Sequence, residues 1–294
     1  LIAERNEEDI EDAIKSVATQ LKGAFSLIIM TNEKLIGLRD RCGFRPLSLG
    51  KLKGSYLFAS ETSAFNLIGA EFIREIEPGE MVVIDKNGLK SSRILPAGKA
   101  AFCVFEFVYL ARPDSDIYGE NVALSRQKMG GKLAQEYPVE ADLVIPVPDS
   151  GRYAAIGYAY QSGIPYGEGL LRNHYIGRTF IQPIQSLREN SVKIKLSPVK
   201  KILEGQRVVL VDDSIVRGTT SKKLIRLLKE AGAREVHLRI SSPPVIWPCC
   251  YGIDTPSKKD LWAANHSLEE TRKWLGADSL GHISIEGLCS VFDK

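Results

Sequence analysis

Two neighbouring carboxylates, Asp212 and Asp213, end an apolar run that begins at Arg207. Gly218 and several hydroxyl residues follow, and helical spacing begins at Thr220. Free backbone N–H groups at a helix start bind phosphate, and a glycine there allows close approach. Two acids beside such a cradle suit sugar hydroxyls, or a divalent cation that bridges the rest of a ligand. The alternative is a strand that ends in solvated acids before an ordinary helix, but the complete arrangement favours a ligand site.

Helices and strands should alternate around this segment. Alternation of this kind predicts crossover units and a mainly parallel, doubly wound sheet. Ligands bind such sheets at the carboxyl ends of the strands, which is where the two acids fall. The expected helices are 121–136, 152–161 and 220–231, and the expected strands are 141–147, 207–211 and 235–240.

The first ninety or so residues have a different pattern. An amphipathic helix is expected over 7–21, followed by short apolar runs separated by turn residues, which predict antiparallel strands. The pattern loosens over 91–101, so we divide the chain into domains 1–96 and 97–294. The expected strands of the first domain are 24–30, 34–38, 56–60 and 80–84.

Composition excludes several classes of function. The chain has 294 residues, with 39 Lys plus Arg against 36 Asp plus Glu. The resulting net charge of +3 is too small to argue for nucleic acid or an anionic membrane, and no apolar run could span a bilayer. The five cysteines are scattered and odd in number, which indicates reduced thiols and a cytoplasmic protein rather than a disulfide framework.

The segment 211–221, Val-Asp-Asp-Ser-Ile-Val-Arg-Gly-Thr-Thr-Ser, resembles the phosphoribosylpyrophosphate motif of type I phosphoribosyltransferases, and of the amidophosphoribosyltransferases in particular. The resemblance covers essentially the whole chain. It implies an α/β fold: a type I phosphoribosyltransferase domain, with helices on both faces of a parallel sheet, preceded by the second half of an N-terminal-nucleophile glutaminase αββα domain. Further matching segments are 43–47, 59–62, 76–80, 113–115, 147–150, 168–170, 175–183 and 251–254.

The resemblance also implies roles for individual residues. Asp212 and Asp213 would hold the ribose side of the ligand and, with Ser150, a magnesium ion. Tyr175 and Arg178 would belong to a mobile lid, with Arg178 as a partner for pyrophosphate. The remaining substrate-binding residues would be Ser214, Arg217, Gly218, Thr219, Thr220 and Ser221.

The implied reaction is the first committed step of de novo purine nucleotide biosynthesis. Ammonia from glutamine displaces pyrophosphate from phosphoribosylpyrophosphate and gives phosphoribosylamine. The resemblance further implies purine nucleotide inhibitors and a homotetramer. Just before Tyr175, where the family usually has Lys-Asn-Arg, this chain has Arg172, Asn173 and His174, so the lid keeps one charge and loses most of another near neutral pH.

The family cleaves glutamine with an N-terminal cysteine whose own amino group acts as the base. This sequence opens at Leu1, so we interpret it as lacking the nucleophile region and the C-terminal tail. On that interpretation the expected activity is ammonia-dependent only, without glutaminase turnover. Cys42 stands where the family tends to have Pro-Asn-Gly, and we interpret it as a bystander in a turn.

Cys103 and Cys249 occupy positions that carry iron–sulfur ligands in one branch of the family. A [4Fe–4S] cluster needs four thiolates. The other two ligands would come from a Cys-x-x-Cys tail, so we expect the cluster in the intact protein rather than in this chain. Small buried hydrophobes are the alternative role for each cysteine.

Two rival functions remain open. One is an orotate or purine-salvage phosphoribosyltransferase, against which the glutaminase-like first domain argues. The other is a non-catalytic regulator that senses phosphoribosylpyrophosphate and binds DNA. Such a regulator needs a basic helix-turn-helix module, which a strand-rich first domain and a net charge of +3 do not offer.

Overall fold

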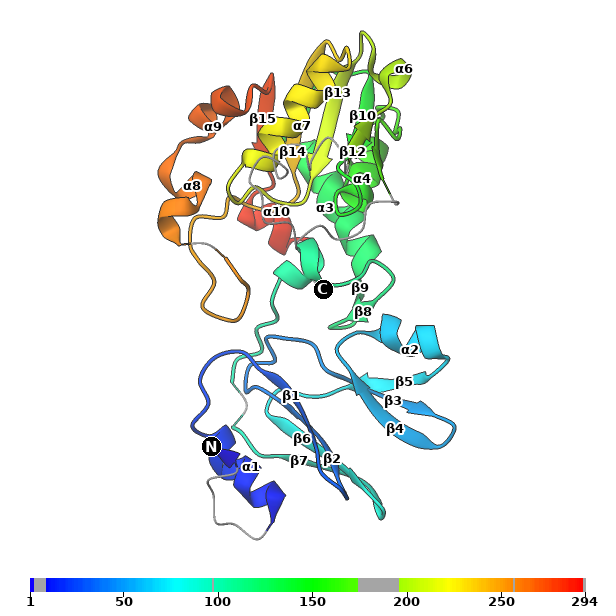
Figure 1. Cartoon of the computed structure of the whole chain (residues 1–294), viewed down its shortest axis with the longest axis vertical. Coiled ribbons are helices and arrows are strands. Elements are labelled where there is room, and N and C mark those ends of the chain that lie inside the picture. The colour runs from blue at the N-terminus through cyan, green and yellow to red at the C-terminus, as the bar shows by residue number, and fades with distance from the viewer. Residues whose placement is uncertain (3–8, 97, 174–195, 256, 293–294) are drawn as a thin grey trace. The chain divides into compact units, whose positions relative to one another are not determined.

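The computed structural model describes residues 1–2, 9–96, 98–173, 196–255 and 257–292. The chain divides into two compact units (Figure 1). The first consists of Leu1–Glu106, Leu110–Val122 and Cys250–Ile253, and the second of Phe107–Tyr109, Ala123–Cys249 and Asp254–Lys294. The boundary that we predict at residues 96 and 97 stays a prediction. None of the helices in the described ranges is long and apolar enough to cross a membrane.

The first unit is built in four layers. Strands β1, β2, β6 and β7 form an antiparallel sheet, and β4, β3 and β5 form a second one. The sequence predicts β1, β2, β4 and β6 among these antiparallel strands. Met81 and Val83 of β6 pack in a core with α1, whereas Val82 between them packs with the second sheet. Phe65 of α2 packs on the far side of that sheet, against Gly50. The order helix, sheet, sheet, helix is the αββα arrangement that the resemblance implies.

Several elements of this unit differ from the sequence prediction. The strands β3, β5 and β7 are absent from the prediction, because they are short and carry charged or glycine residues. The helix α2 is also absent from it, because at seven residues it is too short to show a clear helical period. The bounds are α1 Ile10–Ala18, β1 Ser26–Met30, β2 Leu35–Arg39, β3 Ser48–Leu52, β4 Ser55–Ala59, α2 Thr62–Ile68, β5 Glu71–Glu75, β6 Glu80–Asp85, β7 Gly88–Arg93, β8 Asp116–Ile117 and β9 Glu120–Asn121.

The second unit contains a parallel sheet with strand order β10-β13-β14-β15 (Figure 1). The π-helical turn η2, Glu106–Leu110, comes before this sheet in the chain. The bounds in this unit are α3 Val122–Glu136, β10 Leu143–Pro146, α4 Arg152–Ser162, β11 Leu170–Arg172, β12 Leu196–Pro198, α6 Lys200–Leu203, β13 Arg207–Asp212, α7 Thr219–Glu230, β14 Glu235–Ile240, η3 Lys258–Asp260, α8 Trp262–Asn265, α9 Leu268–Leu275, β15 Ser279–His282 and α10 Ile285–Cys289.

The predicted helices and strands around the acid pair are confirmed to within two residues at either end. Val208 and Leu210 of β13 pack in one core with residues of α7 and α9. Alternate strand residues point to opposite faces, so Val209 and Val211 face the other side, where α4 packs on β10 and β13. The sheet is therefore covered on both faces. The last three helices and β15 are absent from the sequence prediction, because their apolar runs are only a few residues long.

The strand order places a topological switch point between β10 and β13. Val144 of β10 also forms a parallel bridge to Tyr166, on the side of β10 away from β13. The chain therefore leaves β10 in one direction across the sheet and leaves β13 in the other. Loops at the carboxyl ends of two such strands diverge and open a crevice, which is where parallel α/β sheets bind their ligands.

Two glycines allow α3 and α4 to pack at very short range. A Cβ atom on Gly130 would lie 1.9 Å from the carbonyl oxygen of Ala154, and one on Gly157 would lie 1.9 Å from that of Gln127. Backbone therefore packs directly on backbone at this crossing. The contact fixes the position of α3, and with it the side chains that α3 directs toward the sheet.

We expect Gly130→Ala to lower the free energy of unfolding by about 1–3 kcal/mol or more, because the added methyl group overlaps a backbone carbonyl that cannot rotate away. Gly131→Ala is the matched control in the same helix. Its Cβ would lie 3.8 Å from Gln161, an ordinary contact, so alanine should be neutral or stabilising by up to about 1 kcal/mol. Urea titration of both variants measures the difference, and equal stabilities would contradict the close-packed crossing.

Candidate active site

The two acids lie at the carboxyl end of β13, in the middle of the sheet. The backbone carbonyl of Asp212 accepts a hydrogen bond from the Ser241 N–H at 3.0 Å, which ties the strand end to β14. The Asp213 N–H donates to Oδ1 of Asp212 at 2.9 Å. Both side chains are only 7% exposed. They are therefore not the solvated ends of an ordinary strand, which was the alternative interpretation of the sequence.

Asp213 is also the meeting point of two loops. Its carboxylate accepts a hydrogen bond from the Ser214 hydroxyl, and the Ser150 hydroxyl is near enough to lower the pKa of Asp213. Ser214 is the next residue along the β13 loop, whereas Ser150 follows β10 on the other side of the switch point. The structure thus brings together Ser150 and Asp213, which the resemblance assigns to one metal site, although they are 63 residues apart in the sequence.

The electrostatics of the acid pair are unfavourable without a cation. Burial raises the pKa of Asp212 well above its ordinary value, and the neighbouring charge of Asp213 raises it further. Burial also raises the pKa of Asp213, against the opposing effects of the Ser150 and Ser214 hydrogen bonds and the positive charge of Arg126. A bound divalent cation would reverse both shifts, because it stabilises the carboxylate form. The residues present therefore fit Mg²⁺.

Arg126 is a site residue that the sequence analysis did not identify. It lies on α3, is only 4% exposed, and its Nε donates to the carbonyl oxygen of Phe107 at 2.6 Å. Its charge is close enough to Asp213 to lower the pKa of that carboxyl. A lone arginine in a helical run carries no sequence signal of this kind, because only the α3–α4 crossing places it beside the acid.

We expect Arg126→Gln to move the acidic limb of magnesium-dependent ligand binding toward neutral pH. Loss of the positive charge removes an effect that lowers the pKa of Asp213, so the carboxyl is protonated at a higher pH and stops binding the cation there. Dissociation constants measured across the acid to neutral range would locate the limb. Arg126→Lys keeps the charge and should stay near the wild type, whereas a Gln variant with an unshifted limb would exclude this role.

The predicted phosphate cradle lies where α7 begins, and its role stays a prediction. Gly218 adopts a left-handed conformation, with φ 72°, at the residue before α7. The first residues of α7, Thr219 and Thr220, are exposed, and Ser221 is buried. The first N–H groups of a helix have no partner within the helix, so the start of α7 could bind a phosphate. Arg217 is exposed beside the cradle.

Part of the predicted site lies outside the described residues. Tyr175 and Arg178, and also His174, fall in the range 174–195. Arg172, at the edge of that range, forms an ion pair with Asp149 at 2.5 Å. Asp149 directly precedes Ser150. The ion pair therefore connects the end of β11 to the loop that carries Ser150.

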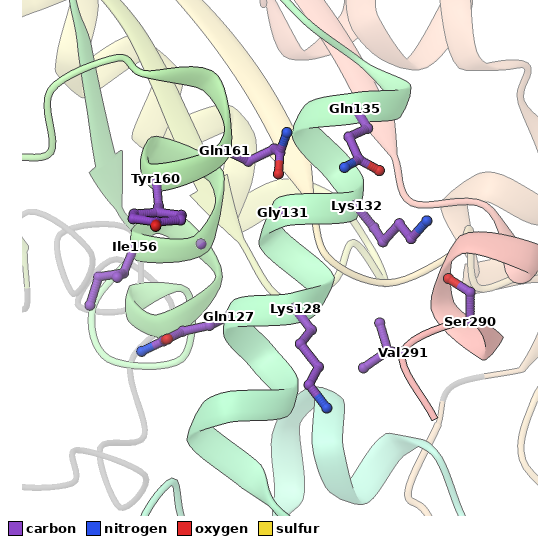
Figure 2. A pocket seen from close by; sticks show the side chains of 11 residues that line it. Gln127, Lys128, Gly131, Lys132, Gln135, Ile156, Tyr160, Gln161, Ser290 and Val291 are labelled. Carbon is purple, nitrogen blue, oxygen red and sulfur yellow. The ribbon is translucent and has the colours of Figure 1, made fainter. Parts of the chain in front are cut away.

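A separate cavity of about 510 Å³ lies between α3, α4 and the residues after α10 (Figure 2). Lys132 and Gln135 of α3 border it on one side, and Tyr160 and Gln161 of α4 border it on the other (Figure 2). No residue of the acid pair or the cradle lines this cavity. It therefore takes no part in the site described above.

The first unit also joins segments that the resemblance named separately. The carboxylate of Glu61 accepts hydrogen bonds from the Arg112 N–H at 2.8 Å and the Ser115 hydroxyl at 2.7 Å. Cys103 is partly buried, and Nη1 of Arg45 lies 3.8 Å from its sulfur. Cys42 lies in a turn, where its backbone N–H donates to the Asp40 carboxylate. This position agrees with a purely structural role.

Comparison with known proteins places these units in a family. A family model described as a phosphoribosyl transferase domain matches residues 120–241, and a glutamine amidotransferase domain matches residues 4–67. The amidophosphoribosyltransferase of Bacillus subtilis is 52% identical over 279 residues, 95% of this chain and 59% of the relative. That of Archaeoglobus fulgidus is 49% identical over 96% of this chain and 62% of the relative. The chain thus spans about three fifths of the length of these relatives.

A solved structure supports the same assignment. The glutamine phosphoribosylpyrophosphate amidotransferase of B. subtilis, complexed with ADP and GMP, superposes with a TM-score of 0.93 at 51% identity, covering 99% of this chain and 64% of that one. The fold and site therefore define a phosphoribosyltransferase of type I joined to a glutamine amidotransferase domain. Within that class, the chain belongs to the amidophosphoribosyltransferase family.

Proposed function

We propose that this chain carries the phosphoribosyl-transfer step of an amidophosphoribosyltransferase. In that reaction ammonia released from glutamine displaces pyrophosphate from phosphoribosylpyrophosphate and yields phosphoribosylamine. The observation that carries the proposal is the buried pair Asp212 and Asp213 at the switch point, followed directly by the Gly218 helix start. One end of this arrangement suits a ribose with its metal, and the other suits a 5-phosphate.

The chemistry requires stabilisation of charge rather than a nucleophilic side chain. As pyrophosphate leaves, positive charge develops on the sugar ring, and carboxylates fixed beside the ribose stabilise it. The α7 N–H groups would hold the 5-phosphate and so orient the anomeric carbon. Ser214 orients Asp213 by donating a hydrogen bond to it, and Ser150 helps to keep the Asp213 carboxylate charged by lowering its pKa. Tyr175 and Arg178 are proposed to complete the site from the lid and exclude water, which would compete with ammonia.

Mg²⁺ is the proposed metal, and it would neutralise the pyrophosphate leaving group when bound. Asp212, Asp213 and Ser150 would hold it, since their oxygen atoms are the ligand type that Mg²⁺ prefers. In the described ranges no three His, Cys, Asp or Glu side chains are grouped together, so the proposed site rests on two carboxylates and a serine hydroxyl.

The iron–sulfur cluster remains a proposal that rests on the resemblance. The Arg45 guanidinium beside the Cys103 sulfur is an environment that suits a cluster ligand, because hydrogen bonds to the sulfurs tune such clusters. Cys103 and Cys249 belong to different units, and the described residues do not supply four thiolates in one place. We therefore derive no step of the reaction from the cluster.

In the intact protein, purified without air, we expect Cys103→Ser and Cys249→Ser each to remove the iron, because a cluster that loses one of four thiolates is no longer held. Cys250→Ser is the control, since Cys250 is exposed whereas the two proposed ligands are partly buried. Iron analysis and visible absorbance measure the effect. If the wild-type protein contains no iron, both cysteines are only packing residues. The transferase proposal would not be affected by that result.

The proposal extends to partners that the family suggests. The B. subtilis relative was solved with ADP and GMP, and we propose that purine nucleotides inhibit this protein as well. We further propose a homotetramer located in the cytoplasm. The five free cysteines are consistent with a reducing compartment.

A test of the function separates the enzyme classes directly. Pyrophosphate release from phosphoribosylpyrophosphate should depend on ammonium salts and on Mg²⁺, and it should not respond to adenine, hypoxanthine or orotate. Release that requires one of those bases would instead establish a salvage or orotate enzyme. Binding of the ligand without any release would favour the regulator.

A further inference from the structure

An aromatic stack lies beside the phosphate loop in the second unit. The indole rings of Trp262 and Trp274 stack with their centroids 3.8 Å apart and their planes inclined by 24°. The ring of His266 stacks on the other face of Trp262 at 3.9 Å. Trp262 begins α8 and Trp274 lies near the end of α9, two helices that follow β14 (Figure 1).

This stack contacts the loop at two points. The backbone N–H of Trp262 donates to the carbonyl oxygen of Val216 at 2.9 Å. A Cβ atom on Gly218 would lie 2.9 Å from the Trp274 ring, which is closer than real side chains approach, so the bare glycine packs directly on the indole. Val216 and Gly218 belong to the loop that leads into α7, and Gly218 is part of the predicted cradle. The two tryptophans therefore support this loop directly.

Further contacts hold the two stacked tryptophans, Trp262 and Trp274, in place. The indole N–H of Trp262 donates to Oγ1 of Thr271 on α9 at 3.0 Å, and Thr271 is only 4% exposed. The Lys222 ammonium, from the first turn of α7, lies 4.3 Å from the centroid of the Trp274 ring. The Trp274 side chain also packs against the hydrophobic core below α7. Trp274 thus touches the loop, the start of the helix and the core at once.

The loop needs such support because strand and helix hydrogen bonds do not extend through it. Residues 213–218 lie between the end of β13 and the start of α7. A glycine in the left-handed conformation is flexible, since it also populates other backbone conformations readily. A cradle of N–H groups binds phosphate tightly only when it is held in the binding geometry before the ligand arrives. Packing of an indole on Gly218 restricts the alternatives.

We propose that Trp274, stacked on Trp262, is a positioning residue that holds Val216–Gly218 in the conformation that binds the 5-phosphate. The inference rests on the proposed function for the identity of the ligand, but not for the state of the loop. It assigns a part in substrate binding to α8 and α9. Trp274 acts through the loop and contacts no reacting atom.

The first test measures the loop itself, without ligand. We expect Trp274→Ala to speed hydrogen exchange in peptides that cover residues 214–221 by about tenfold or more, while peptides from β13 and β14 exchange as in the wild type. Trp274→Phe retains a ring against Gly218 and should restore most of the protection. Should the alanine variant fold poorly, the phenylalanine variant and Trp262→Phe provide the same comparison in milder form.

The second test measures binding and turnover. The Trp274→Ala variant should raise the KM for phosphoribosylpyrophosphate about tenfold or more and change kcat much less, because the loop binds the phosphate in the ground state and the transition state alike. Trp247→Phe is the matched control: Trp247 is 65% exposed and pairs with Lys258, whose ammonium lies 3.5 Å from its ring. That variant should behave as the wild type in both assays.

The outcomes separate this inference from the proposed function. Wild-type protein that neither binds nor turns over phosphoribosylpyrophosphate would refute the function, and the exchange measurement would still decide the role of Trp274. Loop peptides with the same exchange rate in the wild type and Trp274→Ala would overturn the inference, even in an active enzyme. A kcat loss as large as the KM change would also overturn it, because it would indicate general damage rather than loop positioning.

Discussion

Replacing both acids, Asp212→Asn with Asp213→Asn, should weaken magnesium-dependent binding of phosphoribosylpyrophosphate by at least about 100-fold and leave the fold intact. The two carboxylates are buried at the switch point, so each would lose a charged interaction with the metal or the ribose. A hydrogen bond to a charged group contributes about 1.5–3 kcal/mol, and about 1.4 kcal/mol corresponds to a tenfold change in affinity. Calorimetry with and without Mg²⁺ measures the loss.

The control removes the same amount of charge from the opposite end of the sheet. Glu140 lies near the start of β13, where it pairs with Arg207, and Glu235 begins β14. We expect Glu140→Gln with Glu235→Gln to bind the ligand as tightly as the wild type. Unchanged affinity in the double Asn variant would show that the two acids do not bind the ligand or its metal. The assignment of Asp212 and Asp213 to a ligand site would then be wrong.

Asp212→Asn alone should make the unliganded protein more stable at neutral pH, in contrast to its effect on binding. A carboxyl whose pKa is raised by folding is most favourable when protonated, so it costs the folded state free energy once the pH exceeds its unfolded pKa. At a pH above both values, the charged form of Asp212 is therefore the less favourable one in the folded state. We expect denaturant titration to give a higher free energy of unfolding for the variant than for the wild type.

The pH dependence gives this prediction its sign. Stability conferred by the protonated Asp212 is present below the unfolded pKa and is lost as the pH rises through the raised folded pKa. The stability difference between the Asn variant and the wild type should therefore grow from acid to neutral pH. Asparagine keeps an oxygen that can accept the Asp213 N–H bond, so that contact is preserved. A variant equally stable at every pH would show that the buried carboxyl carries no such cost.

The amino-acid sequence determined much of the second unit by itself. Alternating apolar runs and helical spacing were sufficient to place β13, α7 and β14, because each of these elements is long and its periodicity is strong. The cradle could also be predicted, since an acid pair, a glycine and a helix start are all local features of one segment. The phosphoribosyltransferase class followed from the residue sequence of that segment, which resembles a family motif. Comparison with known proteins supports this class.

Other features were decided only by the tertiary structure. Ser150 lies near Asp213 because the two loops meet at the switch point, and Arg126 affects the pKa of the same carboxyl from α3, which Gly130 and Gly157 let pack backbone to backbone on α4. Trp274 contacts Gly218 across 56 residues of sequence. Such pairings have no local signal, since neither partner's sequence surroundings depend on the other. They arise where separate elements are packed together, and that packing sets the charge, burial and geometry of the proposed site.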